Sequence, residues 1–497
     1  MSSARRFAWF LFGLLGLLGS DAEAAAPLRG SRPNILLVMS DDQGYGELAC
    51  HGNPILKTPN LDRLHAQSLR FTSFHVSPTC APTRSALLTG RHEFRNGVTH
   101  TIFERERLNP EAVTLAQVLR RAGYATGIFG KWHLGDEDGY LPERRGFGEV
   151  FIHGGGGIGQ SYPGSCGDAP GNRYHDPVVW HGGQFERTRG YCTDVFLEQA
   201  GRWMEERHRA GEPFFAYVTP NAPHDPFVSP GEEWVAPYRE RGLPAYAVNY
   251  YAMIAHFDAA FGRLLARLEE RGLATNTLVI FLTDNGHSVG EVFNAGMRGM
   301  KGTPYEGGTR VPSFWRWPGR IAAGEDCGAL TAHVDIFATL AELAGADLRP
   351  HAGQVEGRSL LPLLEDPAAA WADRLIVTHQ GRWEAGESAA AKYRSCAIRD
   401  SRYKLVNGAE LYDLQSDPGE TRDLRAELPL VAGRLRAAFD AWWADVLPAT
   451  VANEAALGPY QNPFAERYWR QFGDERTQAQ VDRMNPVWKF VRPRPNF

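Results

Sequence analysis

The chain has 497 residues, of which 43% are hydrophobic and 22% are charged, and its formal net charge is −5. One hydrophobic core rarely serves more than about 250–300 residues, so we expect one large domain with a smaller one beside it. The acidic balance excludes a broad basic surface for nucleic acid or anionic lipid, and a bound anion would need a local cluster of positive groups.

The N-terminus has the pattern of an export signal. Arg5 and Arg6 precede an apolar run over residues 7–18, and small residues follow at positions 22 and 24. The run is short for a membrane span, so we expect residues 1–24 to be a cleaved signal peptide, with an uncleaved anchor as the alternative. We therefore predict an exported protein, periplasmic or secreted, without a stable membrane anchor.

Short apolar runs then alternate with amphipathic segments. The runs 35–39, 125–129, 214–218 and 278–282 are predicted strands, and the segments 61–69, 114–122, 250–271 and 333–344 are predicted helices. Alternating strands and helices indicate an α/β fold, with a large doubly wound mixed sheet flanked by helices. The ligand crevice of such a sheet lies at the carboxyl ends of its strands.

After about residue 367 the pattern changes to short strands with tight turns. Residues 375–379, 395–398, 403–406 and 410–412 are predicted strands, followed by a helix over 430–443. We expect a large domain over 31–367, a smaller C-terminal antiparallel-sheet subdomain over 368–448, and a tail over 449–497 packed on the domain. The glycine run 154–157 is predicted to be a flexible loop, because it lacks the context of a nucleotide-binding fingerprint.

Cysteine and lysine are both scarce. The cysteines are Cys50, Cys80, Cys166, Cys192, Cys327 and Cys396. They are too few for a disulfide scaffold and have no zinc spacing, although one disulfide could form, for which Cys166 and Cys192 are candidates. Only six of the 53 basic residues are lysines. A site that needs a compact ammonium cannot accept arginine, so each lysine is mildly informative.

Oxygen-bearing side chains follow two predicted strands. Asp41 and Asp42 come after the first, and Asp284 and Asn285 after the fourth. Hard divalent cations prefer such ligands, and no histidine or cysteine clusters with them, which disfavours zinc. Taken singly, Asp-Asp is also typical of a helix cap and Asp-Asn-Gly of a hairpin turn. The pattern fits calcium and does not distinguish it from magnesium.

Cationic side chains occur in three further blocks. Lys131 and His133 lie in GKWHLG, His224 lies in APHDP, and Lys301 opens KGTPYEGGTR. A lone histidine or lysine is usually a surface or satisfied core group, and the scarcity of lysine argues modestly against that interpretation here.

The segment from Cys80 to Arg91 reads CAPTRSALLTGR. Pro82 stands where a helix would begin, with Cys80 just before it. A helix N-terminus offers unpaired N–H groups to a tetrahedral oxyanion. A buried thiol or half of a disulfide is the ordinary alternative for such a cysteine.

Together these blocks resemble the sulfatase family of the alkaline-phosphatase-like superfamily, whose pattern is Cys-x-Pro-x-Arg followed by a Leu-Thr-Gly-Arg-type stretch. The resemblance covers residues 33–318, and more loosely the C-terminal sheet. It implies that Cys80 is oxidised to formylglycine by a maturation enzyme. The hydrated aldehyde would attack sulfur with one hydroxyl and expel sulfate with the other.

The resemblance also implies a role for each site residue. Asp41, Asp42, Asp284, Asn285 and the modified Cys80 would hold the metal. Lys131 and Lys301 would contact sulfate oxygens, His133 would orient the formylglycine hydroxyls, and His224 would protonate the leaving alcohol. Arg84 would support the modified side chain and the carboxylates. For His287 and His153, substrate contact and a structural role remain equal alternatives.

The function implied is that of an arylsulfatase-like sulfuric ester hydrolase. A sulfated carbohydrate is the favoured substrate, because the export signal and the polar residues expected at the rim suit sugars; these residues are His153, Gln160, Tyr162, His287, Glu291 and Asn294. The alternatives are a phosphonate or phosphate ester hydrolase of the same superfamily, and a silent sulfated-glycan-binding protein if Cys80 stays unmodified.

Overall fold

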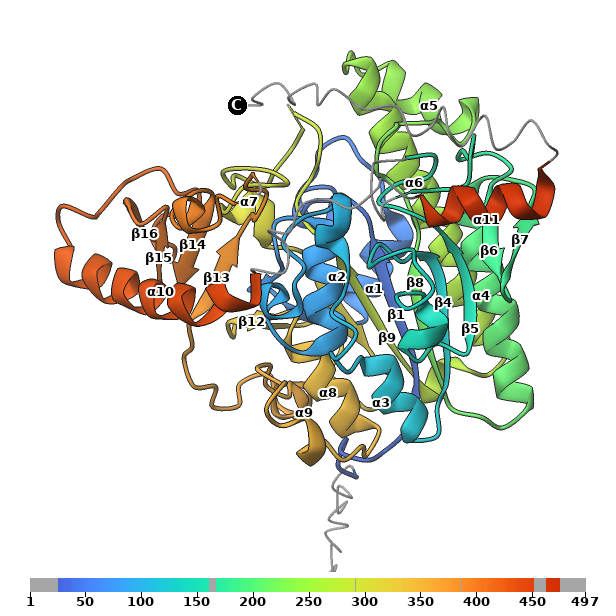
Figure 1. Cartoon of the computed structure of the whole chain (residues 1–497), viewed down its shortest axis with the longest axis horizontal. Helices are drawn as coiled ribbons and strands as arrows, with labels where there is room; N and C mark the ends of the chain where they lie inside the picture. The colour runs from blue at the N-terminus through green and yellow to red at the C-terminus, as the bar shows by residue number, and fades with distance from the viewer. Residues whose placement is uncertain (1–25, 161–166, 291, 385, 451–461, 474–497) are drawn as a thin grey trace, which may run out of the picture.

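The computed structural model describes residues 26–160, 167–290, 292–384, 386–450 and 462–473. Within these ranges a ten-stranded mixed sheet forms the centre of the molecule (Figure 1). Its strands, in order across the sheet, are β11 (Glu325–Cys327), β2 (Leu69–Phe71), β10 (Ser313–Arg316), β9 (Thr277–Thr283), β1 (Asn34–Ser40), β8 (Phe214–Thr219), β4 (Ala125–Lys131), β5 (Glu149–His153), β6 (Val178–His181) and β7 (Gln184–Arg187). The five consecutive strands from β9 to β5 are parallel, so their carboxyl ends meet at one edge.

Helices cover both faces of the sheet, and β1 shows why. Ile35, Leu37 and Met39 pack into one apolar core, whereas Leu36 and Val38 pack into another. The first core includes residues of α2 (Cys80–Thr89), α3 (Leu115–Arg121), α8 (Asp335–Leu343) and α9 (Leu361–Glu365). The second includes residues of α1 (Pro59–Ala66), α4 (Cys192–Arg209) and α6 (Ala245–Glu270), and α5 (Glu232–Arg239) packs on α6. A strand buried on both faces has a continuous apolar sequence, as β1 does.

A separate four-stranded antiparallel sheet follows, seen with α10 at the left of Figure 1. It consists of β13 (Ile376–His379), β14 (Cys396–Arg399), β15 (Tyr403–Val406) and β16 (Glu410–Asp413), and α10 (Pro429–Thr450) packs on it. A buried ionic group joins this sheet to the large domain. Lys404 on β15 lies 3.0 Å from Glu306 in α7 (Glu306–Thr309) and 2.9 Å from Glu420.

Two smaller features complete the fold. Strands β3 (Phe74–His75) and β12 (Thr331–Ala332) form a two-stranded sheet. Helix α11 (Pro463–Phe472) lies against β7, where the Gln471 side chain exchanges two hydrogen bonds of 2.7 Å with the backbone of Phe185. None of the helices in the described ranges is long and apolar enough to cross a membrane.

The predicted fold class is confirmed, with differences at several element ends. The first predicted helix ends at Ala66 rather than residue 69, because Leu69 begins strand β2. The predicted helix from residue 333 begins at Asp335. Cys80 is the first residue of its helix rather than the residue before it, and Pro82 lies within the first turn, where its missing N–H leaves no hydrogen bond unmade.

One of the two cysteines of the candidate disulfide lies within the described residues. Cys192 is a free, buried thiol at the start of α4, packed in the second core. Cys166 lies outside the described residues, as do the predicted signal peptide, 1–24, and the tail positions 451–461 and 474–497.

Candidate active site

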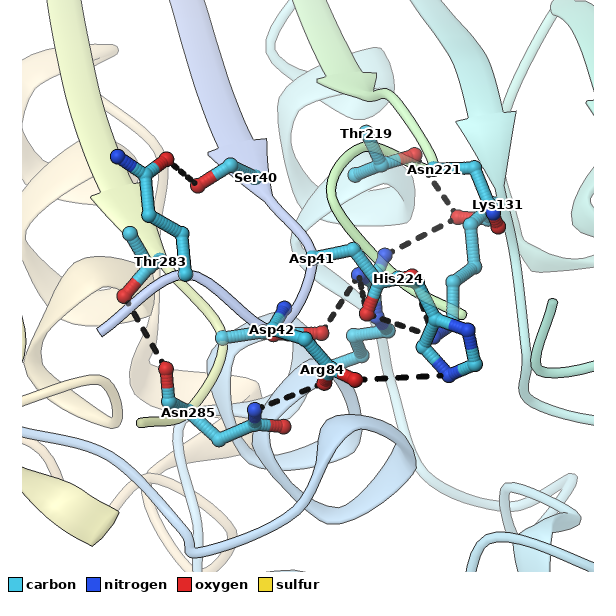
Figure 2. A network of polar contacts seen from close by, with 12 residues as sticks. Ser40, Asp41, Asp42, Arg84, Lys131, Thr219, Asn221, His224, Thr283 and Asn285 are labelled. Atoms are coloured by element: carbon cyan, nitrogen blue, oxygen red, sulfur yellow. Dashed lines mark hydrogen bonds and ion pairs between the residues drawn. The ribbon is translucent and has the colours of Figure 1, made fainter. Parts of the chain in front are cut away.

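The predicted site residues come together at the carboxyl ends of adjacent parallel strands (Figure 2). Asp41 and Asp42 follow β1, Asp284 and Asn285 follow β9, and Lys131 ends β4. All five are buried. Because these strands are neighbours in the sheet, residues far apart in the sequence meet at one place.

Asp41 is held by two cations. Nζ of Lys131 donates to both carboxylate oxygens, at 2.9 and 2.8 Å, and the Arg84 guanidinium lies 3.8 Å from Oδ1. Burial raises the pKa of Asp41 to about 6, although Lys131 opposes the rise. The carboxyl is therefore poised to ionise fully when more positive charge is near it.

Asp42 has a different electrostatic environment. Lys301 Nζ donates to its Oδ2 at 2.6 Å, Asn285 Nδ2 donates to its Oδ1 at 2.9 Å, and His224 Nε2 lies 3.7 Å from Oδ2. Burial alone would raise the pKa of Asp42, but the charges of Lys301 and His224 outweigh burial, and its pKa lies below the ordinary value. This carboxylate is ionised at neutral pH.

Arg84 extends from α2 to the third carboxylate. Its guanidinium donates to Oδ2 of Asp284 at 2.7 Å, and Oδ1 of Asp284 accepts the backbone N–H of Asp42 at 3.1 Å. Burial, with the neighbouring Asp41 charge, raises the pKa of Asp284 to about 6. Arg84 therefore contacts the carboxylates, as expected from the sequence.

Asn285 has an atom suited to a cation. Its amide nitrogen donates to Asp42 and to the carbonyl of Gly286, at 2.9 Å each. Its Oδ1 is buried and has no hydrogen-bond partner among the described residues. Burying an unpaired carbonyl oxygen costs about 1–3 kcal/mol, which coordination to a hard cation would recover. The donor set, three carboxylates and this oxygen, fits calcium or magnesium.

Cys80 lies beside these oxygens. Ligand atoms of Cys80, Asp41 and Asp284 are all within 4.8 Å of one another. Burial alone would raise the pKa of the Cys80 thiol, but the ammonium groups of Lys131 and Lys301 lower it below its ordinary value. The first position of α2 also exposes this side chain to the positive end of the helix.

The two candidate catalytic histidines are buried and have fixed tautomers. His133 Nε2 donates to the carbonyl of Thr101 at 2.7 Å and lies 3.1 Å from Glu106, while His224 Nδ1 donates to the carbonyl of Asp225 at 2.6 Å. Burial is the main cause that lowers the pKa of both, that of His133 to about 4. An anionic ester beside His224 would raise the pKa of that ring toward the value a general acid needs.

Sequence reasoning missed two contributors to these positions. Glu106 comes from a segment without any recognisable motif, so no signal identified it as the partner of His133. The glycine run is not simply a flexible loop, since it packs against both rings. A β-carbon on Gly156 would lie 2.9 Å from Cε1 of His133, and one on Gly157 would lie 3.0 Å from Cε1 of His224. Glycine is needed there for close approach.

The remaining candidates lie around this centre. His287 Nδ1 donates to the carbonyl of Val289 at 2.6 Å, and the His287 carbonyl accepts the backbone N–H of Lys301 at 2.9 Å. Nε2 of His287 and of His153 are buried atoms without a hydrogen-bond partner among the described residues. The Gln160 side chain lies next to Gly157, as the His224 ring does. Asn294 instead donates to backbone carbonyls of its own loop. Tyr162 and Glu291 lie outside the described residues.

Comparison with known proteins agrees with this geometry. The sulfatase family profile matches residues 33–346, and the profile described as N-sulphoglucosamine sulphohydrolase, C-terminal, matches residues 300–431. Arylsulfatase A of Homo sapiens is 36% identical over 454 residues, which cover 80% of this chain and 85% of that protein. The N-acetylgalactosamine-6-sulfatase of Rattus norvegicus is 33% identical over 394 residues, covering 73% of this chain and 71% of that protein.

A solved structure shares the fold. Ps i-CgsB, in complex with k-i-k-neocarrahexaose, superposes with a TM-score of 0.75 at 24% identity, over 90% of this chain and 99% of that one. The family profile alone spans more than half of the sequence. From its matching profile, its relatives and the cluster at the strand ends, the chain belongs to the sulfatase family, within the alkaline-phosphatase-like superfamily, and is a sulfuric ester hydrolase.

Proposed function

We propose that this protein is a calcium-dependent sulfatase that acts on a sulfated carbohydrate, with Cys80 converted to formylglycine as the nucleophile. Sulfatases use a formylglycine and a metal ion. The observation that carries the proposal is the convergence of Asp41, Asp42, Asp284 and the unpaired Asn285 oxygen beside Cys80.

Asp41, Asp42, Asp284, Asn285 and the modified residue 80 would hold the cation. Bound there, calcium and the formylglycine hydrate would supply positive charge and a nucleophilic hydroxyl for the sulfate ester. The positive and negative side chains that the chain places around this centre are equal in number, because Lys131, Lys301 and Arg84 each contact one carboxylate. A bound dication therefore makes the centre net positive, as an anionic ester requires.

The surrounding side chains bind and orient the ester. Lys131 and Lys301 offer ammonium groups to the sulfate oxygens and stabilise negative charge that develops there. Lys301 is suited to reach a ligand, because 17% of its side chain is exposed, whereas Lys131 is fully buried. His133, fixed by Thr101 and Glu106, orients the nucleophile, and His224 donates a proton from Nε2 to the leaving oxygen.

A carbohydrate substrate is supported by the relatives. One is an N-acetylgalactosamine-6-sulfatase, and solved structures with the same fold hold k-i-k-neocarrahexaose and D-glucosamine-2-N,6-O-disulfate. Gln160 and His153 lie near His224 and can bind sugar hydroxyls. The export signal expected at residues 1–24 would place the enzyme where extracellular polysaccharides occur, and a maturation enzyme would modify residue 80.

The test has two parts. Peptide mass spectrometry of active protein should show formylglycine in place of the Cys80 thiol, and Cys80→Ala should lose turnover. Values of kcat/KM are then compared for sulfated monosaccharides, sulfated oligosaccharides, an aryl sulfate and matched phosphate and phosphonate esters. Efficient aryl sulfate hydrolysis with no detectable turnover of any sulfated sugar would remove the carbohydrate assignment. Preference for the phosphorus esters would favour the alternative hydrolase.

A further inference from the structure

A second group of metal-ligating side chains lies outside the active site. Cys50, His51 and His65 each place one ligating atom within 4.8 Å of the others. Cys50 and His51 belong to a short 3-10 helix, Ala49–His51, and His65 lies in the last turn of α1. Thiolate sulfur and imidazole nitrogen are the ligands that zinc prefers, in contrast to the oxygen ligands of the active site.

The group opens to solvent. All three side chains are half-buried, and they line a surface cavity of about 380 Å³ whose walls include Arg70 and Asp326. An ion can therefore enter, and the cavity has room for a water molecule as fourth ligand. The side chain of Asp326 is 58% exposed and contributes negative charge at the entrance.

His51 is oriented as metal-binding histidines usually are. Its Nδ1 donates to the carbonyl of Tyr45 at 2.8 Å, which leaves the Nε2 lone pair for a ligand. A carbonyl on the opposite nitrogen fixes both tautomer and ring orientation in many metal sites. The Tyr45 ring stacks on His51 at 3.9 Å.

His65 offers the second nitrogen. Its Nδ1 lies 3.4 Å from the Arg70 guanidinium, which can only donate, so Nδ1 carries a lone pair. That contact is long and weak, and Arg70 has better acceptors in Asp326 and in the Gly324 carbonyl at 2.9 Å. A cation can therefore replace Arg70 at this nitrogen without leaving the guanidinium unpaired.

Cys50 supplies the sulfur. Its backbone N–H donates to Oδ1 of Asp62 at 2.9 Å, and the residue lines the surface cavity together with both histidines. A thiol binds a metal as the thiolate, so metal binding at Cys50 releases a proton to solvent.

We propose that Cys50, His51 and His65 form a zinc site, with water as the fourth ligand. The ion anchors the loop that leaves β1. Tyr45 lies only three residues after Asp42. Its ring contacts the His51 ring and also the Arg310 guanidinium, which lies 4.7 Å from the Tyr45 ring centroid. The site thus stabilises the segment that carries two active-site carboxylates, without touching the ester.

Cobalt(II) is the probe, because thiolate ligation gives a charge-transfer absorption that oxygen ligands do not. The full-length protein is titrated with Co²⁺ in excess Ca²⁺, and Zn²⁺ is then added. We expect one equivalent of Co²⁺ with the thiolate absorption, displaced by Zn²⁺. Cys50→Ser should abolish the absorption, and His65→Gln should weaken Co²⁺ binding by at least about tenfold. The exposed His208 provides the matched control, as His208→Gln.

The Cys80→Ser variant tests whether the absorption comes from the active site instead. A thiolate absorption that disappears in Cys80→Ser but persists in Cys50→Ser would overturn the proposal. So would the lack of any thiolate absorption in the unmutated chain. A measurement on the unmutated protein covers the case in which Cys50→Ser does not fold. Zn²⁺ should slow alkylation of Cys50 by iodoacetamide at least tenfold, read by peptide mass spectrometry, and an unchanged rate would refute zinc binding.

Discussion

The ammonium of Lys301 donates to Oδ2 of Asp42 across 2.6 Å. The loop that carries Lys301 is tied on two sides. The backbone N–H of Lys301 donates to the carbonyl of His287 at 2.9 Å. The N–H of Gly302 donates at 2.7 Å to the carbonyl of Pro78, which lies two residues before Cys80. The ammonium is therefore fixed relative to both the carboxylates and the segment that carries Cys80.

Lys301→Arg should damage catalysis although it keeps the charge. A guanidinium is a wide planar fork and cannot occupy the position of a compact ammonium beside Asp42. Displacing such a group by about 1 Å costs about 100-fold, and we expect the loss mainly in kcat. Steady-state kinetics on an aryl sulfate would measure it, with the exposed Lys57→Arg as the control. A kinetically silent Lys301→Arg would exclude this lysine from the transition state.

Asp284→Ala should lose the metal. The substitution removes a carboxylate ligand and leaves the buried Arg84 guanidinium without its partner at 2.7 Å. Metal affinity should fall by at least about tenfold. Elemental analysis after dialysis would show this loss. Asp258→Asn is the matched control, because Asp258 is a buried carboxylate that binds Asn60 and Leu61 away from the site. Equal metal content in the two variants would contradict the ligand assignment.

Gly157→Ala should impair turnover without unfolding the protein. The added β-carbon would lie 3.0 Å from Cε1 and Nδ1 of His224, so the ring must shift by a few tenths of an ångström. We expect about a tenfold loss of kcat. Gly139→Ala is the control, because a β-carbon there meets nothing within 4 Å. Equal kcat in the two variants would show that the glycine run does not position His224.

His181 should make stability depend on pH. Two hydrogen bonds, of which the one with Glu149 has the larger effect and the other is with Glu186, raise the pKa of His181 from 6.5 to about 9. The stabilisation is therefore complete below pH 6.5 and is lost as the pH rises through about 9. Because His181 and its two carboxylate partners are partly solvated, we expect this stabilisation to be about 1 kcal/mol, less than the full pKa shift would give.

The comparison is between the unmutated protein and His181→Asn in urea unfolding titrations. The variant should be less stable at about pH 6 and equally stable above about pH 9.5. The exposed His208→Asn controls for loss of a histidine as such. A stability difference that stays constant across this range would mean that packing, and not the two carboxylates, accounts for His181.

The class of fold and the residues of the candidate site were both predicted from the sequence alone. Strands β1, β8 and β9 are buried on both faces, so their apolar runs are continuous and their positions could be predicted. The CAPTR block and the polar residues after each strand identified the chemistry, because both are local patterns. Short strands such as β2, β6 and β11 have three or four residues and partly exposed faces, and they carried no comparable signal.

The tertiary structure decided which charges pair and which small residues must stay small. Lys131 meets Asp41 across 90 positions of sequence and Lys301 meets Asp42 across 259, so each pairing depends on the order of strands in the sheet. The same holds for Glu106 behind His133, for Gly157 against His224, and for Cys50 beside His65. Sequence periodicity records whether a side chain is buried, but a contact between distant residues is fixed only when packing brings their strands and helices together.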